Sequence, residues 1–478
     1  MTLASQTISA LRRQLTAGDI RSRDIVESIS AAIAAKNEDI GAYLSVDLAD
    51  ALAQADAADL SQPLGGIPIA IKDNINVKGQ PCTCGSRFLA GAYTSPYDAT
   101  VAHKLRSSGA VLFGKTNLDE FAMGSATENS ALQITRNPHD PTRIPGGSSG
   151  GSAAAIASQT AVAALGSDTG GSIRQPASHC GIVGLKPSYG RVSRFGLVAF
   201  ASSLDQIGPM TRTVEDAALV LEAISGPDPR DSTCLDQPVP SFTEGLHAGP
   251  AGLKLGLPRE YFGDGLDPEV RSQVDAAIKA LEQEGAEIVE ISLPSTRHAV
   301  STYYILAPAE ASSNLSRFDG VRYGNRVADD GDGILGMYGK SRQNGFGPEV
   351  KRRIILGTYV LSSGYYDAYY SRAQKVRTLI QREFNAAFED VDAILSPVSP
   401  MPARKLGENA DDPLQDYLAD IYTLSANLAG VCGISVPCGT VPGDNGTRLP
   451  VGLQILGPHL AEQTILRTAQ AWETIHGA

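Results

Sequence analysis

The chain has few cysteines, little positive charge and no long hydrophobic run, and each shortage excludes a class of protein. Six cysteines in 478 residues are too few for a disulfide framework, so we expect reduced thiols. Cys82 and Cys84 lie close together, but no His or Cys pair has the spacing of a zinc site, and we expect no metal. The formal net charge of −12 argues against a broad nucleic-acid surface.

Segments that would lead the chain into or across a membrane are also missing from the sequence. Residues 1–6 contain no basic segment leading into an apolar one, which argues against a secretory signal. No apolar run reaches the roughly 20 residues that a membrane helix needs. Hydrophobic residues make up 42% and charged residues 19% of the chain, as in ordinary folded proteins. We therefore expect a folded cytoplasmic protein with no membrane partner.

Helix and strand patterns alternate along the chain, which is typical of the α/β class. Residues 1–60 form a predicted N-terminal helical layer, and residues 253–293 contain a strand, a well-capped helix and a second strand, which predicts a parallel pair. No repeat or linker interrupts the pattern, so we expect a single large domain over residues 1–478. The predicted strands lie at 67–72, 110–114, 253–257, 288–291, 393–395 and 451–455, with helices near 8–15, 25–33, 99–105, 213–224, 268–284 and from 462 onward.

Two glycine- and serine-rich runs, at residues 145–155 and 167–174, are the most unusual feature of the sequence. Glycine lets backbone N–H groups approach a ligand closely. The first run continues into an apolar segment, which predicts a buried helix with Ser148 and Ser149 at its N-terminus. The second run ends in Arg174 and Pro176, which predicts a constrained loop. We interpret the two runs as a serine-based acyl-transfer site.

Two kinds of serine chemistry fit these runs. Residues 146–150 match G-x-S-x-G, the nucleophile elbow of α/β-hydrolases, which requires an acid and a histidine further along the chain. No hydrophobic strand precedes this match, so a histidine triad is the second choice. Its candidate histidines are His179, His247, His298, His459 and His476.

The segments 71–74, 146–152 and 168–174, taken together and in this order, resemble the amidase signature family, and the match runs from about residue 145 to residue 209. The resemblance implies a Ser–cis-Ser–Lys triad with Ser172 as nucleophile, Ser148 as bridging serine and Lys72 as base. It also implies one domain with a mixed sheet covered by helices on both faces, and a catalytic core over residues 65–215.

The chemistry of such a triad explains these residue types. A serine hydroxyl is a weak nucleophile until a base takes its proton, and lysine can act as that base only when burial keeps it neutral. Backbone N–H groups of Thr169, Gly170, Gly171 and Ser172 could stabilise the oxyanion. We expect Asp168 and Arg174 to hold the loop by charge-assisted hydrogen bonds, and Ser149 and Ser152 to serve in capping or packing.

Further stretches, at 116–125, 310–320, 362–370 and 427–430, resemble the family of A subunits of bacterial glutamyl-tRNA(Gln)/aspartyl-tRNA(Asn) amidotransferases. This resemblance implies a glutaminase that supplies ammonia for converting Glu-tRNA(Gln), Asp-tRNA(Asn) or both. The substrate glutamine would bind through Arg353 and Asp420, with Tyr304 and Ser125 as further candidates.

The same resemblance implies partners rather than cofactors for this chain. A B subunit would use ATP and magnesium to activate the misacylated tRNA and would make most of the tRNA contacts, and a small C subunit would complete a heterotrimer. The chain itself would need no cofactor.

Two other functions remain possible from the sequence. One is a freestanding amidase of the same family that acts on another small amide. The other is a non-catalytic scaffold, which the joint presence of Lys72, Ser148 and Ser172 argues against.

Overall fold

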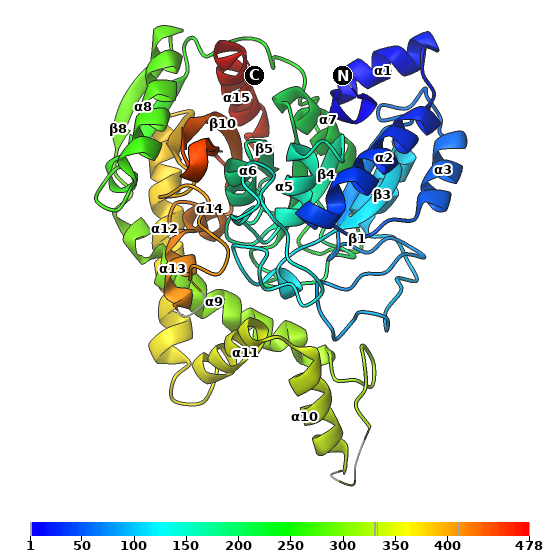
Figure 1. Ribbon diagram of the computed structural model, residues 1–478. Helices are drawn as coiled ribbons and strands as arrows, with labels where there is room; N and C mark the ends of the chain where they lie inside the picture. The colour runs from blue at the N-terminus through cyan, green and yellow to red at the C-terminus, as the bar shows by residue number, and fades with distance from the viewer. Residues whose placement is uncertain (1, 329–330, 332, 410–411, 478) are drawn as a thin grey trace.

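A mixed β-sheet runs through the molecule (Figure 1). The computed structural model describes residues 2–328, 331, 333–409 and 412–477. Within these residues the strand order is β1-β3-β2-β4-β6-β5-β10-β11-β9-β7-β8. The strands are β1 (Tyr43–Ser45), β2 (Pro68–Lys72), β3 (Val111–Thr116), β4 (Ala163–Asp168), β5 (Val183–Lys186), β6 (Gln206–Thr211), β7 (Lys254–Pro258), β8 (Glu287–Ile291), β9 (Ala393–Pro397), β10 (Cys432–Pro442) and β11 (Arg448–Gly457).

Helices fill most of the connections between these strands. Figure 1 shows both chain ends at one end of the molecule and α10 with α11 projecting at the other. The helices are α1 (Ile8–Ala17), α2 (Ser22–Ile40), α3 (Leu48–Asp56), α4 (Thr100–Ser107), α5 (Gly150–Ala157), α6 (Arg174–Cys180), α7 (Val214–Ile224), α8 (Pro268–Gln283), α9 (Ala299–Asn314), α10 (Gly333–Gly345), α11 (Pro348–Val360), α12 (Arg372–Asp390), α13 (Pro413–Leu418), α14 (Leu424–Ala429) and α15 (Glu462–His476).

Both faces of the sheet are buried, as alternate residues of β2 demonstrate. Ile69 and Ile71 pack into one apolar cluster with side chains of α1, α2, α4 and α7, whereas Ala70 packs into another with side chains of α5 and α6. Successive side chains of a strand point to opposite faces. The predicted α/β fold, with a mixed sheet covered by helices on both faces, is confirmed.

The centre of one half of the sheet is parallel, and this arrangement positions the site. Strand β2 pairs in parallel with both β3 and β4. The carboxyl ends of neighbouring parallel strands meet at one edge, where α/β proteins usually bind ligands. Lys72 and Asp168, the last residues of β2 and β4, therefore lie at the same edge.

The predicted strand–helix–strand unit at 253–293 is also present. Strands β7 and β8 pair in parallel, and the Asp267 side chain accepts hydrogen bonds from the backbone of Glu269 and Val270 at the start of α8. This cap is the reason that the helix begins where the sequence predicted.

Two elements differ from the sequence prediction. Residues Arg174–Cys180 form the helix α6 rather than a loop, because Pro176 stands in the first turn, where no N–H is needed. The long strand β10 was not predicted, because Gly433, Pro437 and Gly439 interrupt its apolar pattern. Its register shifts between Pro437 and Gly439, which is how the strand accommodates them.

Candidate active site

Lys72 ends β2, and its amine is fully buried among hydroxyl groups. The Nζ atom lies 2.8 Å from Ser148 Oγ, 2.8 Å from Ser149 Oγ and 2.9 Å from Ser167 Oγ. No carboxylate in the described part of the chain forms an ion pair with this amine. The contact between Lys72 and Ser148 that the triad requires is therefore present.

Burial also sets the protonation of this amine. Loss of hydration lowers the pKa of Lys72 to about 7, although the carboxylates of Asp119, Asp168 and Asp205 act in the opposite direction. An ordinary lysine is almost entirely protonated at neutral pH. A large fraction of the Lys72 amine is uncharged there and can accept a proton.

Ser148 and Ser149 directly precede α5, as the sequence predicted. The peptide bond between Gly147 and Ser148 is cis. The Gly147 N–H donates to Gln175 Oε1 over 2.9 Å, and a Cβ atom at residue 147 would lie 2.2 Å from Asp119 Oδ2. Only glycine fits this close approach, which holds Ser148 against Lys72.

Ser172 lies on the loop between β4 and α6, and 8% of its surface is exposed. Its carbonyl oxygen accepts a hydrogen bond of 3.1 Å from the Ser149 N–H, which joins the two serine-bearing segments. Among the residues that the structure describes, its hydroxyl contacts no hydrogen-bond partner, Ser148 included. The structure therefore brings Lys72 and Ser148 together and places Ser172 on the adjoining segment.

The four N–H groups predicted for the oxyanion hole differ in whether they already have a hydrogen-bond acceptor. The Gly171 N–H donates to Asp168 Oδ1 over 2.8 Å, so the prediction for Gly171 is corrected: the carboxylate already occupies this donor. The N–H groups of Thr169, Gly170 and Ser172 meet no acceptor within the described residues. Gly171 has a different role, because its φ of +135° and a Cβ only 2.3 Å from Thr423 Oγ1 exclude other residues.

Asp168 and Arg174 hold this loop from inside the core, as predicted. Arg174 Nε lies 3.1 Å from Asp168 Oδ2, and both side chains are fully buried. Burial alone would raise the pKa of Asp168, but the charge and hydrogen bonds of Arg174 outweigh it and lower the pKa to about 2. Arg174 also donates to Gln454 Oε1 and Asn427 Oδ1, so the pair ties the loop to β11 and α14.

Arg353 lies on the buried side of α11, with 3% of its surface exposed. Its Nε donates to Glu349 Oε1 over 2.7 Å, and its guanidinium lies 5.3 Å from the ring centroid of Tyr304 and 5.5 Å from that of Tyr417. These contacts fix the plane of the guanidinium. Its two terminal nitrogens donate to no described residue, so they are available to a ligand.

Asp420 and Ser125 are in direct contact with each other. The Ser125 hydroxyl donates to Asp420 Oδ2. Burial raises the pKa of Asp420 to about 7, although the hydrogen bond from Ser125 and the charge of Arg353 lower it. Asp420 is joined to the serine loop through Thr423, whose hydroxyl donates to the Gly170 carbonyl over 2.7 Å.

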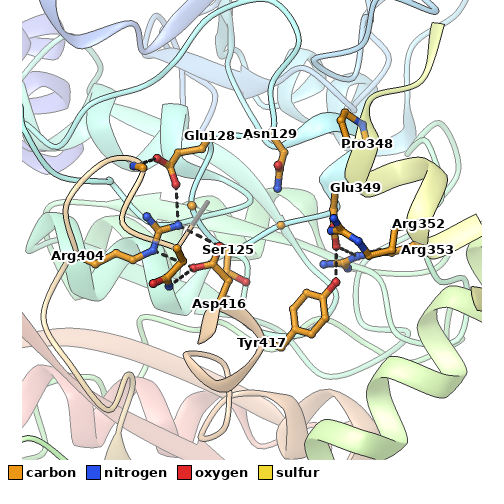
Figure 2. Close-up of a pocket in the computed structure, with 14 residues that line it drawn as sticks. Ser125, Glu128, Asn129, Pro348, Glu349, Arg352, Arg353, Arg404, Asp416 and Tyr417 are labelled. Carbon is orange, nitrogen blue, oxygen red and sulfur yellow. Dashed lines mark hydrogen bonds and ion pairs between the residues drawn. The ribbon is translucent and has the colours of Figure 1, made fainter. Parts of the chain in front are cut away.

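A cavity of about 300 Å³ opens beside these residues. Ser125 and Arg353 line it, whereas Tyr304, Asp420 and the triad residues are not among its lining residues. Figure 2 shows Arg353 and Tyr417 both directed at Glu349, and Arg404 held between Glu128 and Asp416. The cavity is therefore lined by arginines and carboxylates that pair with one another.

Several contributing residues were not identified from the sequence. Ser167 contacts the lysine amine and is itself held by Asn74, and Glu349 and Tyr417 orient Arg353. A signal existed for Ser167, because it stands next to Asp168 at the end of a strand parallel to β2. Ser149, which we expected in capping or packing, contacts Lys72 directly. Ser152 does pack, with its hydroxyl bonded to the Leu165 carbonyl.

No histidine completes the alternative triad among the described residues. His179 is buried in α6, its ring nitrogens bond neither serine, and burial lowers its pKa to about 4. The other four candidates, His247, His298, His459 and His476, are exposed, and none hydrogen-bonds Ser148 or Ser172. The histidine triad is excluded.

Among the described residues, no helix is both long and apolar enough to cross a membrane. No group of three or more His, Cys, Asp or Glu side chains in that part of the chain could hold a metal ion.

Comparisons with known proteins agree with this geometry. The model of the amidase family matches residues 24–466. The chain is 59% identical over 465 residues to the A subunit of glutamyl-tRNA(Gln) amidotransferase from Akkermansia muciniphila, covering 97% of this chain and 98% of that protein. It is 55% identical to the protein of the same name from Methylacidiphilum infernorum, covering 100% and 96% of the two chains.

A solved structure is similar over the same length. The crystal structure of the A subunit of glutamyl-tRNA(Gln) amidotransferase from Thermotoga maritima superposes with a TM-score of 0.80 at 43% identity, covering 99% of this chain and 95% of that one. The family match and these relatives cover nearly the whole chain, and the buried lysine and the two serine segments agree with them. The chain therefore belongs to the amidase family.

Proposed function

We propose that this chain is the glutaminase subunit of a tRNA-dependent amidotransferase. It hydrolyses the side-chain amide of glutamine and supplies ammonia for converting Glu-tRNA(Gln), Asp-tRNA(Asn) or both. Relatives that are 55–59% identical over nearly the whole chain are named as the A subunit of glutamyl-tRNA(Gln) amidotransferase, which favours this function over a freestanding amidase.

The proposed chemistry is a proton relay with no imidazole. The Ser172 hydroxyl rotates onto Ser148 Oγ and gives up its proton, while Ser148 passes its own proton to the neutral amine of Lys72. Ser172 Oγ then bonds to the amide carbon of glutamine, and the carbonyl oxygen becomes an oxyanion. The unoccupied N–H groups of Thr169, Gly170 and Ser172 are suited to stabilise this charge.

The relay then runs in reverse. The proton returns from Lys72 through Ser148 to the amide nitrogen, the C–N bond breaks, and ammonia leaves a glutamyl ester on Ser172. Water attacks this ester and loses a proton through the same relay, which releases glutamate and restores the Ser172 hydroxyl.

The surroundings of Arg353 and Asp420 are the observation that carries the proposal. Arg353 is buried, oriented by Glu349 and the tyrosines, and keeps both terminal nitrogens without a described partner, so it can bind the α-carboxylate bidentately. Asp420, with Ser125 beside it, can accept from the α-ammonium, and Tyr304 supports the guanidinium. Opposite charges next to the serine loop match an amino acid better than a simple amide.

The partners and compartment belong to the same proposal. The relatives' names describe one lettered component of an amidotransferase, which supports a multi-subunit enzyme. We propose B and C subunits in a heterotrimer, with ATP, magnesium and most tRNA contacts on the B subunit, in the cytoplasm. The net charge of −12 is consistent with tRNA being held mainly by a partner.

Ammonia release from glutamine tests the proposal. The full chain with its partner subunits should release ammonia from glutamine and hydrolyse simple aliphatic amides much more slowly. Arg353→Ala should raise the KM for glutamine about a hundredfold with a smaller change in kcat, because a bidentate ion pair is worth about 2–3 kcal/mol or more. Lys351→Ala, two residues away, is the control. Efficient hydrolysis of simple amides with none of glutamine would favour the freestanding amidase.

A further inference from the structure

The lysine amine is surrounded by more hydroxyl groups than the triad uses. Lys72 Nζ lies within 2.9 Å of three serine oxygens, those of Ser148, Ser149 and Ser167, and 3.3 Å from the Ser167 carbonyl oxygen. All three serines are at most 2% exposed. An ammonium has three N–H donors, so three acceptors satisfy it completely, but a neutral amine has only two N–H bonds and one lone pair.

The other hydrogen bonds of Ser149 determine whether its hydroxyl can donate to Lys72 or only accept from it. Its hydroxyl donates to the Ser167 carbonyl over 3.1 Å and accepts from the Ser167 N–H over 3.2 Å. With its one proton and one lone pair occupied, only an accepting position faces Lys72. Ser149 can therefore hold a Lys72 N–H but is poorly placed to give a proton to the amine.

Ser167 is held in a similar way from the other side. The Asn74 amide nitrogen, which can only donate, lies 2.9 Å from Ser167 Oγ, so one lone pair of this hydroxyl is occupied. The second lone pair faces the Lys72 amine at 2.9 Å. Asn74, at 2% exposure, is itself fixed by burial.

Ser148 differs from Ser149 because, apart from Lys72, its hydroxyl has no hydrogen-bond partner within the described residues, so its proton is uncommitted. It differs from Ser167 in two ways: no amide donor holds its oxygen, and it adjoins Ser149, whose N–H bonds the Ser172 carbonyl. Ser148 is therefore the best placed of the three to pass a proton between the Ser172 segment and the amine.

We infer that Ser149 and Ser167 are positioning residues, whose hydroxyl oxygens hold two N–H bonds of Lys72 and so direct the nitrogen lone pair at Ser148 Oγ. Asn74 supports this arrangement through Ser167. The inference rests on the proposed amidase chemistry, in which Lys72 must be neutral and must meet Ser148 in one orientation.

Three alanine variants test it in the full chain with its partner subunits. Ser149→Ala and Ser167→Ala should each lower kcat for glutamine at least about tenfold and leave KM within about twofold, because the glutamine pocket is not touched. Ser152→Ala is the matched control: it removes an equally buried serine of α5 whose hydroxyl bonds Thr116 and Leu165 rather than Lys72. It should keep the wild-type kcat, and thermal unfolding should show that all three variants are folded.

A second measurement separates this inference from the choice of substrate. A fluorophosphonate reacts with an activated serine without needing a glutamine pocket, so its rate of reaction with Ser172 reports the relay alone. In both positioning variants this rate should fall at least about tenfold. The acid limb of the pH profile of this labelling rate should also move to lower pH. Loss of a hydroxyl acceptor destabilises the Lys72 ammonium more than the neutral amine and so lowers the pKa of Lys72.

The outcomes are distinct. Wild-type labelling rates and an unmoved acid limb in both variants would overturn the inference, as would a change in KM alone or an equal loss in Ser152→Ala. Wild-type protein that is labelled but ignores glutamine would instead contradict the proposed glutaminase function, and the labelling rates of the variants would still decide the role of Ser149 and Ser167. If one variant fails to fold, the other gives the answer.

Discussion

At the scale of single residues, the environment of Lys72 determines when the site can work. Its amine meets hydroxyls rather than carboxylates, and burial lowers its pKa to about 7. Below that pH the amine is protonated and cannot accept a proton from Ser148. The rate at which a fluorophosphonate labels Ser172 should therefore rise about tenfold per pH unit below 7 and level off above it. A rate that is flat between about pH 5 and 8 would show that the base is not this amine.

Asp420 adds a second ionisation that concerns binding. Burial raises its pKa to about 7, so the carboxylate that would accept the α-ammonium of glutamine is charged only above that pH. The KM for glutamine should fall as pH rises through 7, and Asp420→Asn should raise KM and remove this dependence. Fluorophosphonate labelling, which needs no ammonium site, is the control and should keep its wild-type pH profile in the variant.

Residues that touch across long sequence separations show what the sequence could and could not predict. Nothing but resemblance connected Lys72 to Ser148, 76 positions away, because their contact depends on which strands are neighbours. The role of Arg353 was harder to predict from the sequence, because this residue directly follows two other cationic residues. A helical pattern of buried positions, with Val350, Arg353, Gly357 and Val360 on one side of α11, would have singled it out.

At the scale of elements, the packing of α11 on α9 positions Arg353 and Tyr304 of the proposed glutamine pocket. A Cβ atom on Gly357 would lie 1.9 Å from the Pro308 carbonyl oxygen of α9. Arg353 is one turn earlier on α11, and Tyr304 is one turn earlier on α9. The close approach of the two helices at Gly357 therefore sets the distance between guanidinium and tyrosine.

Gly357→Ala should force the two helices apart. We expect a loss of about 1–3 kcal/mol in the free energy of unfolding, as for other overpacked sites, and a KM for glutamine raised about tenfold with little change in fluorophosphonate labelling. Gly339→Ala is the control, because residue 339 lies in α10 with open space around it, and alanine should be neutral or slightly stabilising there. Unchanged KM and stability in Gly357→Ala would mean that the helix spacing does not matter.

Elements with clear caps and periodicity could be predicted from the sequence, whereas elements that depend on pairing with distant strands could not. Helix α8 has Asp267 as its cap and was predicted within a residue or two. Strand β10 contains two glycines and two prolines and is stabilised by pairing with β5 and β11 on either side. Such tertiary pairing overrides local propensity and leaves no local signal.

At the scale of the whole molecule, the fold brings three separate segments to one edge of the sheet. The end of β2 supplies the lysine, the turn before α5 supplies Ser148, and the loop after β4 supplies Ser172, while α11 and the segment before α14 supply the charges of the proposed pocket. The fold class followed from alternating patterns and from resemblance. The sequence could not predict which N–H groups are free to stabilise the oxyanion, because only the folded structure shows that the Asp168 carboxylate accepts from the Gly171 N–H.

The covalent intermediate would report the roles of Ser172 and Lys72 in a single experiment. The full chain with its partner subunits would be mixed with glutamine, quenched in acid within one turnover and mapped by peptide mass spectrometry. A glutamyl adduct should appear on Ser172 and be absent from Lys72→Ala, whereas Lys78→Ala, which removes an exposed lysine, should retain it. An adduct on Ser148 or Ser149, or a normal yield on Ser172 in Lys72→Ala, would contradict the account.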